Sequence, residues 1–327
     1  MTATHRVRTA DKNTVGFMID GVFYSNHYIR QNIEYIDNLF LKENGILAEG
    51  ELLELDYKKD VIDREYDRLA AENPFVRDVQ EELLAWKSDR MHQVLQLEGT
   101  RQVGKTTELL KFAYRNYEFV IYVSLAEDNY GFAEAVRCGA TPIEFEKYCV
   151  RAGLPSFVNS SSTILIIDEI QRSQMVYNAI RTMHRNVQCD IIVTGSYLGR
   201  ILQDKGFFLP AGTVSCHTMF PLSFMEFCRI FDAETTLKTI DLYGESDSAA
   251  YGRLTKLYEL YIQIGGYPEV VRRYIESGDI GECYNVIGKL LGTFKDESRN
   301  YFSLPREVEI FDVVYREALQ EMCSEKR

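Results

Sequence analysis

Nine consecutive residues, Gly99 to Thr107, have the types and spacing of a phosphate-binding loop, G-x-x-x-x-G-K-[ST]. Glycine at both ends of such a loop lets the backbone bend sharply and approach an anion without a Cβ in the way. Amides at the start of the following helix point at the anion, and the helix dipole favours it. Lys105 supplies a mobile positive charge, and the Thr106 hydroxyl an oxygen ligand for Mg²⁺. The predicted nucleotide-binding residues are Gly99, Thr100, Arg101, Gln102, Val103, Gly104, Lys105, Thr106 and Thr107.

The residues on either side of this loop test the match, because the pattern also arises by chance and a phosphate loop requires a strand before it and a helix after it. Gln93–Leu97 is short and largely apolar, as a buried strand should be. Thr106 to Tyr117 alternates apolar and polar residues at the period of an amphipathic helix. The alternative is a glycine-rich turn before a basic helix start, but a strand before and a helix after favour the phosphate loop.

Two acids follow a second apolar run. Thr163–Ile167 predicts a buried strand, and Asp168 and Glu169 come directly after it, at the carboxyl edge of the sheet, where ligands bind in open α/β folds. Asp168 suits a Mg²⁺ role, and Glu169 suits a general base that polarises a water molecule. The alternative is a strand followed by an acidic helix start.

A third strand, Asp190–Thr194, is expected between the other two, so Thr194 or Ser196 would reach the γ-phosphate or the water. A small-residue turn is the competing interpretation. Arg181 and Arg185 share a helix face and could act on a neighbouring subunit's nucleotide, although such pairs usually form a solvated face. The predicted catalytic residues are Lys105, Glu169 and Ser196, and the predicted metal ligands are Thr106 and Asp168.

From residue 92 onward, apolar strand-like runs alternate with helical patterns, which predicts a parallel α/β sheet. The further strands are expected at Phe119–Leu125 and Thr213–Met219, and the helices at Gly104–Tyr117, Pro142–Ala152, Gln174–Arg185 and Tyr197–Gln203. Residues 1–90 are expected to form a helical extension after a poorly ordered start, with helices at Tyr28–Leu41, Glu51–Ala71 and Phe75–Trp86. Three parts result: the extension at 1–90, a nucleotide-binding domain at 91–230 and a helical region at 231–327.

Net charge, cysteine content and the lengths of apolar runs argue against a DNA-binding, a disulfide-stabilised or a membrane-spanning protein. The net charge is −12 with no basic arm, so we expect no DNA binding tighter than the non-specific range of about 10⁻⁴–10⁻⁶ M. Seven cysteines without a C-x-x-C pair predict free thiols in a reducing cytoplasm. We find no apolar run of membrane-spanning length and no signal peptide at the start of the sequence.

Five runs in the chain, occurring in the expected order, resemble a group of prokaryotic ATPases of the AAA type. They are GTRQVGKTT, LIIDEIQ, IIVTGSYLG, PLSFMEF (Pro221–Phe227) and GGYPEVV (Gly265–Val271). The resemblance implies a P-loop NTPase core of the additional-strand class, similar to archaeal-type ATPases. It also implies that Lys105 and Thr106 hold the nucleotide and Mg²⁺, and that Asp168 and Glu169 are the metal and catalytic acids. The family's C-terminal half runs on into a winged-helix-like region, so we expect residues 231–327 to be incomplete.

The leading hypothesis is Mg²⁺-dependent ATP hydrolysis for an unidentified protein client, in a chain that could oligomerise. One alternative is a nucleotide-dependent switch or scaffold with little turnover; another is a phosphotransferase. The Asp168-Glu169 pair favours hydrolysis, and the absence of an [NT]-K-x-D motif favours ATP over GTP. The C-terminal stretch Leu304 to Cys323 predicts an amphipathic helix that docks on the preceding helical region.

Overall fold

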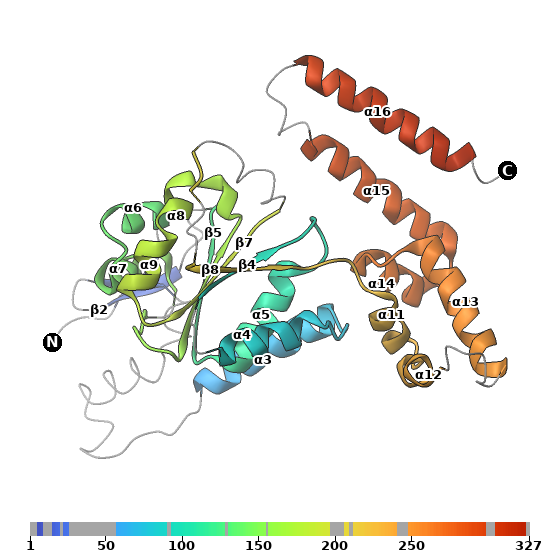
Figure 1. Cartoon of the computed structure of the whole chain (residues 1–327). Coiled ribbons are helices and arrows are strands. Elements are labelled where there is room, and N and C mark those ends of the chain that lie inside the picture. The colour runs from blue at the N-terminus through green and yellow to red at the C-terminus, as the bar shows by residue number, and fades with distance from the viewer. Residues whose placement is uncertain are drawn as a thin grey trace. The chain divides into compact units, whose positions relative to one another are not determined.

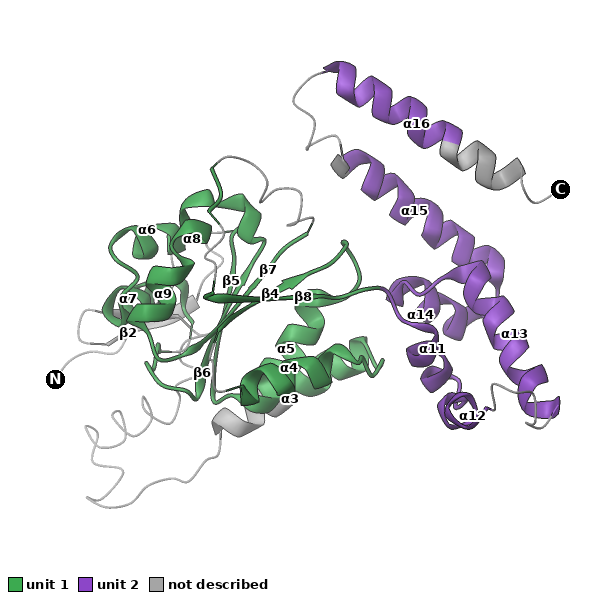
Figure 2. Ribbon diagram, in the orientation of Figure 1, with its two compact units in different colours: residues 1–220 green, residues 221–327 purple. Residues whose placement is uncertain are grey.

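The computed structural model describes residues 5–8, 15–19, 22–25, 57–89, 93–127, 130–154, 156–196, 206–208, 212–240, 248–298 and 305–324. The chain divides into two compact units, residues 1–220 and 221–327, which Figure 2 colours separately. Each unit has a buried cluster of its own apolar side chains.

The larger unit contains a five-stranded, all-parallel sheet with the strand order β5-β6-β7-β4-β8. The strands are β4 (Val94–Glu98), β5 (Phe119–Ser124), β6 (Thr163–Asp168), β7 (Asp190–Thr194) and β8 (Val214–Thr218). The five predicted strands are confirmed to within one residue at either end. The β7 strand lies between β4 and β6, which is the arrangement expected of the additional-strand class.

Helices cover both faces of this sheet (Figure 1). One face carries α5, against which α3 and α4 pack; the other carries α6 to α9. The bounds are α3 (Tyr57–Glu72), α4 (Val79–Ser88), α5 (Lys105–Asn116), α6 (Phe132–Arg137), α7 (Pro142–Ala152), α8 (Gln174–Asn178) and α9 (Ile180–Asn186).

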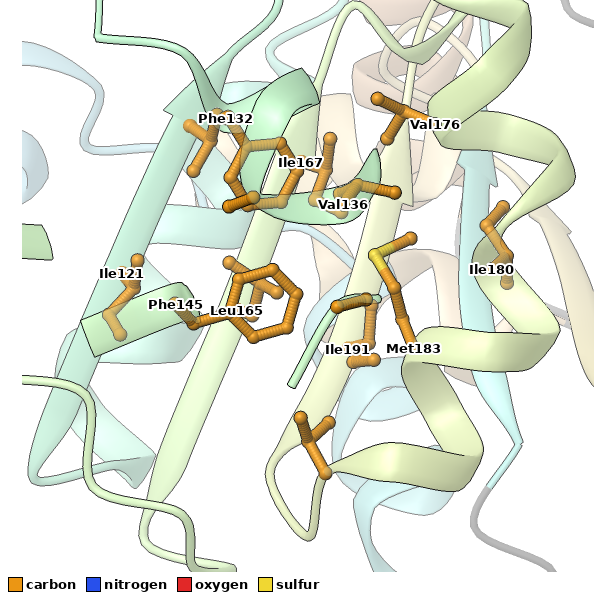
Figure 3. Packing of buried hydrophobic residues seen from close by; sticks show 14 of the residues in the cluster. Ile121, Phe132, Val136, Phe145, Leu165, Ile167, Val176, Ile180, Met183 and Ile191 are labelled. Carbon is orange, nitrogen blue, oxygen red and sulfur yellow. The ribbon is translucent and has the colours of Figure 1, made fainter. Parts of the chain in front are cut away.

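Side chains alternate between the two faces along each strand, because successive residues of a strand point to opposite sides. Ile121, Leu165 and Ile191 point to the face of α6 to α9, where they pack in one cluster with Phe145 and Met183 (Figure 3). The intervening positions of β5 and β6, which end in Ser124 and Asp168, therefore point to the face of α5. This alternation places the polar residues at the ends of these strands beside the phosphate-binding loop.

The N-terminal region differs in part from the prediction. Helices α3 and α4 confirm a helical character for residues 57–72 and 79–88, but three strands that were not predicted precede them. They form an antiparallel sheet of β1 (His5–Arg8), β2 (Val15–Ile19) and β3 (Val22–Ser25). The available signal was Asp20-Gly21 between the runs Val15–Ile19 and Val22–Ser25, because this dipeptide is typical of a two-residue hairpin turn. The predicted helix Tyr28–Leu41 lies outside the described residues.

The predicted start of the second N-terminal helix is wrong. That helix, α4, was expected to begin at Phe75 but begins at Val79, after a turn that follows α3. Phe75 is buried in this turn, and the buried Arg77 donates to the Val103 oxygen (2.9 Å) and the Phe220 oxygen (2.6 Å). A buried guanidinium needs hydrogen-bond acceptors, and the Val103 and Phe220 carbonyls supply them. The turn thereby attaches the N-terminal helices to the phosphate-binding loop.

The helix predicted over Gln174–Arg185 is also interrupted. Residues 174–186 form two short helices, α8 and α9, that meet at Ala179, after a 3₁₀ turn over Ile170–Arg172. Ser173 caps α8 by accepting from the Val176 amide, which fixes where that helix begins. The predicted helix Tyr197–Gln203 lies outside the described residues.

The smaller unit is helical throughout its described residues. Its helices are α11 (Phe224–Ile230), α12 (Glu234–Thr239), α13 (Ser248–Ile264), α14 (Pro268–Ser277), α15 (Ile280–Ser298) and α16 (Pro305–Ser324). Ser223 and Glu226 form a capping box at the start of α11, which fixes where that helix begins. The motifs PLSFMEF and GGYPEVV meet, because the Leu222 amide donates to the Gly266 oxygen at 2.7 Å. A Cβ on Gly266 would lie 2.1 Å from the Leu222 oxygen, so the contact requires glycine.

The final helix, α16, confirms the helix predicted over Leu304 to Cys323. One side contacts α15, where Tyr315 donates to the Leu291 oxygen at 3.3 Å and Asp312 pairs with Lys295 at 3.4 Å. Three apolar side chains of α16 are nevertheless exposed: Ile310, Val313 and Val314. Among the described residues, we find no helix long and apolar enough to span a bilayer.

Candidate functional site

The phosphate-binding loop joins β4 to α5 and has a backbone that few residue types can adopt. Gly99 has φ +149° and Gly104 has φ +94°, in the region that favours glycine. A Cβ on Gly99 would lie 2.3 Å from the Met219 oxygen, so the close approach of these two backbones excludes any side chain. Gln102 also has a positive φ, 62°. The backbone of the loop therefore favours glycine at both of these positions, and α5 begins directly after Gly104.

Lys105 is the first residue of α5, and its ammonium group lies within the loop. Its Nζ donates to the Gly99 oxygen (2.8 Å) and the Thr100 oxygen (2.9 Å), and lies 3.4 Å from Ser196 Oγ. The side chain is buried, and this burial lowers the pKa of Lys105 to about 8. A desolvated ammonium whose hydrogen-bond partners are neutral oxygens favours a bound anion, because a phosphate would offset the cost of burying the positive charge.

Asp168 ends β6 beside the start of α5 and joins the two sequence motifs. Thr106 Oγ1 donates to Asp168 Oδ2 at 2.7 Å. Hydroxyl and carboxylate oxygens are the ligands that Mg²⁺ prefers, and Mg²⁺ commonly takes only one or two protein ligands beside water and phosphate oxygens. Among the described residues we find no cluster of three His, Cys, Asp or Glu side chains for a metal ion. The pair thus fits a Mg²⁺ ion that arrives with a nucleotide.

Glu169 follows Asp168 in a left-handed backbone conformation, with φ 53°. Its carboxylate is engaged on both sides: Gln171 Nε2 donates to Oε2, and Arg101 Nη2 of the phosphate loop lies 4.0 Å from Oε1. About 22% of the Glu169 side chain is exposed, so water can reach it. Left-handed conformations are costly for residues other than glycine and occur often at functional sites.

Two residues at the end of β7 were candidates for contacting phosphate, and the structure distinguishes them. Thr194 is buried, and its hydroxyl donates to the Leu97 oxygen at 2.9 Å, joining β7 to β4. Ser196 lies beside Lys105 Nζ. Ser196, rather than Thr194, therefore shares the space of the phosphate loop.

The other predicted residues are dispersed. Val103 is fully buried, and its carbonyl accepts from Arg77, so its side chain is part of the core. Arg181 and Arg185 lie on α9, exposed, on the helices that cover the opposite face from α5. The structure brings the loop together with Asp168, Glu169 and Ser196 but places these two arginines elsewhere in this chain.

Sequence reasoning missed Tyr122 and Gln171. Tyr122 lies on β5, and its hydroxyl donates to Asp168 Oδ2 at 2.8 Å. It stands in an apolar run, FVIYVS, that looks like any buried strand. Gln171 follows the acids and was quoted only as part of LIIDEIQ. Its spacing of two residues from Glu169 was the available signal.

Comparison with known proteins gives one family match and several distant structural likenesses. Residues 91–228 match a family described as an AAA domain. No curated protein matches the chain. A Walker-type ATPase of Pyrococcus abyssi is 15% identical, over 69% of this chain and 76% of its own, with a TM-score of 0.42. RuvB of Thermotoga maritima is 13% identical, over 66% and 70%, with a TM-score of 0.37.

Domain III of the Thermotoga maritima replication initiation protein DnaA is 14% identical, over 64% of this chain and 90% of that one, with a TM-score of 0.36. The family match at residues 91–228 covers the whole parallel sheet and the phosphate-binding loop.

Proposed function

We propose that this chain, which carries an AAA-type P-loop domain over residues 91–228, binds ATP with Mg²⁺ and hydrolyses it. The observation that carries the proposal is the hydrogen bond of 2.7 Å between Thr106 Oγ1 and Asp168 Oδ2. It joins residues 62 positions apart at the carboxyl edge of the sheet, which is the edge where open α/β folds bind ligands.

The residues of the loop would hold the triphosphate. The backbone amides at the start of α5 and the ammonium of Lys105 would face the phosphate oxygens, and Ser196 would add a hydroxyl on the far side of Lys105. Mg²⁺, held by Thr106 and oriented by Asp168, would neutralise charge on the phosphates. Positioning and charge neutralisation of this kind account for most of the catalysis of phosphoryl transfer.

Glu169 is the residue we assign to proton transfer. An ionised carboxylate accepts hydrogen bonds only, so it can orient a water molecule and take its proton. Gln171 and Arg101 hold the two carboxylate oxygens, which fixes the orientation of the group.

The contacts of Glu169 with Gln171 and Arg101 also favour a second candidate function, a nucleotide-dependent switch with little turnover. A carboxylate that is engaged by Gln171 and Arg101 is less available to a water molecule than a free one. The wild-type rate of phosphate release separates the two candidates: sustained turnover supports the ATPase, whereas tight binding without turnover supports the switch.

The test of binding is a calorimetric titration of ATP, with Mg²⁺, into the wild type and Lys105→Ala. We expect the variant to lose most of the affinity, about tenfold or more, because it lacks the ammonium that lies at the Gly99 and Thr100 oxygens, where the phosphates would bind. Lys147→Ala is the matched control, since Lys147 is an exposed lysine of α7 paired with Glu144. Equal affinity of wild type and Lys105→Ala would refute the proposal.

A further inference from the structure

Three groups converge on the carboxylate of Asp168. Oδ2 accepts from the Thr106 hydroxyl at 2.7 Å and from the Tyr122 hydroxyl at 2.8 Å, and Oδ1 accepts from the Glu169 amide at 2.7 Å. A carboxylate has about four lone-pair positions, so these donors leave little freedom for it to rotate. Two of the donors belong to the sequence motifs, and the third, Tyr122, does not.

The register of the sheet explains why Tyr122 reaches this carboxylate. In the pairing of β5 with β6, Tyr122 lies opposite Ile166 and Ser124 opposite Asp168. The tyrosine is thus two residues before the level of the acid, roughly 6–7 Å along the strand and on the same face. A phenol ring spans that offset, whereas a shorter side chain at this position would end beside Ile166.

We propose that Tyr122 is a positioning residue that orients Asp168, and through it the Thr106 hydroxyl, for Mg²⁺ binding at the proposed ATP site. If Thr106 Oγ1 gives a lone pair to a metal ion, its proton must point elsewhere, and Asp168 Oδ2 is the acceptor in place. The direction of that lone pair then depends on the rotation of the carboxylate, which Tyr122 restricts from the neighbouring strand. Partners of this kind typically change metal affinity by about 10–100-fold when they are removed.

The chemistry of the phenol fits this role. Burial, with the neighbouring Asp168 charge, raises the pKa of Tyr122 above its ordinary value, so the hydroxyl remains protonated and donates to the carboxylate. Replacement by phenylalanine keeps the ring and removes the donor alone. The packing of β5 against its neighbours is then preserved, which makes the substitution a specific test.

The experiment measures ATP affinity as a function of Mg²⁺ concentration, from EDTA upward, for the wild type and Tyr122→Phe. Without Mg²⁺ both proteins should bind ATP equally, because Tyr122 has no role toward the phosphates. The Mg²⁺ concentration that gives half of the Mg²⁺-dependent gain in affinity should rise about tenfold in the variant. In an Asp168→Asn background, the same substitution should add little, because the effect acts through that carboxylate.

Tyr117→Phe is the matched control. The Tyr117 hydroxyl donates to Asp190 Oδ2 at 2.5 Å, so this variant also removes a phenol–carboxylate hydrogen bond of the same sheet. An unchanged Mg²⁺ requirement in Tyr122→Phe, or an equal shift in Tyr117→Phe, would overturn the proposal. Because the proposal depends on the proposed function, a wild type without Mg²⁺-dependent ATP binding would refute both, and that outcome is distinguishable from failure of Tyr122 alone.

Discussion

The two edges of the parallel sheet contain the same chemical pair in different surroundings. At the carboxyl edge Tyr122 donates to Asp168, and at the amino edge Tyr117 donates to Asp190, the first residue of β7. Asp168 also accepts a hydrogen bond from Thr106 at the start of α5, next to Lys105, whose ammonium donates to a loop carbonyl. Tyr117 is covered by Lys87, whose Nζ lies 3.8 Å from the ring centroid.

The difference lies in what each pair can still bind. The amino-edge pair is enclosed between secondary-structure elements, so its hydrogen bond stabilises the fold. The carboxyl-edge pair borders a loop whose amides and ammonium favour an anion. The same kind of hydrogen bond thus stabilises the fold at the amino edge and belongs to the candidate site at the carboxyl edge, where a glycine-rich loop joins β4 to the N-terminus of α5.

The largest effect expected at the carboxyl edge is on turnover. Glu169→Gln should reduce phosphate release at saturating ATP by at least tenfold, because general-base assistance is worth about 10²–10⁴-fold. ATP affinity should be retained, since Glu169 contacts Gln171 and Arg101 rather than the loop carbonyls. Glu118→Gln makes the same change at an exposed position next to the amino edge and should have no effect on turnover. Wild-type turnover in Glu169→Gln would exclude it as the base.

The next largest effect is a loss of stability when a glycine at either edge of the sheet is replaced by alanine. Gly99→Ala should cost stability in two ways: an unfavourable φ and a Cβ 2.3 Å from the Met219 oxygen. Gly212, before β8, has φ +78° but open space around its Cβ position, so Gly212→Ala should cost only the backbone term of about 1–2 kcal/mol. Overpacking should add about 1–3 kcal/mol at Gly99. Urea unfolding measures both variants, and equal losses would contradict the close approach of residues 99 and 219.

A smaller effect is expected from the amino-edge pair itself. Tyr117→Phe should lower the free energy of unfolding by about 1–3 kcal/mol, because the substitution removes a hydrogen bond to a carboxylate in a largely buried position. The loss should be at least as large as that of Tyr122→Phe, whose ring is less buried. Denaturant unfolding of the two single variants is the measurement. A Tyr117→Phe protein as stable as the wild type would remove the structural role assigned to this edge.

The smallest effect is a pH dependence from buried thiols near the amino edge. Burial raises the pKa of Cys149 and of Cys189, the neighbour of Asp190, to about 12. In the unfolded chain these thiols lose their protons near pH 9, whereas in the folded protein they keep them, so stability is complete below about pH 9 and falls between pH 9 and 12. Cys189→Ala should make that decline shallower in unfolding measurements from pH 8 to 10.5. An unchanged slope would show that Cys189 ionises equally in both states.

The sequence alone determined most of the sheet and the principal residues of the candidate site. Glycine, lysine and threonine at this spacing predict a phosphate-binding loop when a strand precedes them and a helix follows. Apolar runs bounded by turns predict buried strands. The acids were placed correctly because the position of a residue at the end of a parallel strand determines its edge. The starts of α11 and α14 likewise depend on residues within a few positions. Ser223 forms a capping box, and Pro268 stands in the first turn.

Only the tertiary structure decided the contacts that join distant strands. Tyr122 has the local pattern of a core residue, and its hydroxyl meets Asp168 because β5 pairs with β6 in one register. Arg77 lies in an expected helix but turns toward the Val103 carbonyl, because a buried guanidinium requires acceptors that its own helix does not offer. Propensity and periodicity act over a few residues, whereas strand pairing and the satisfaction of buried polar groups depend on which segments meet.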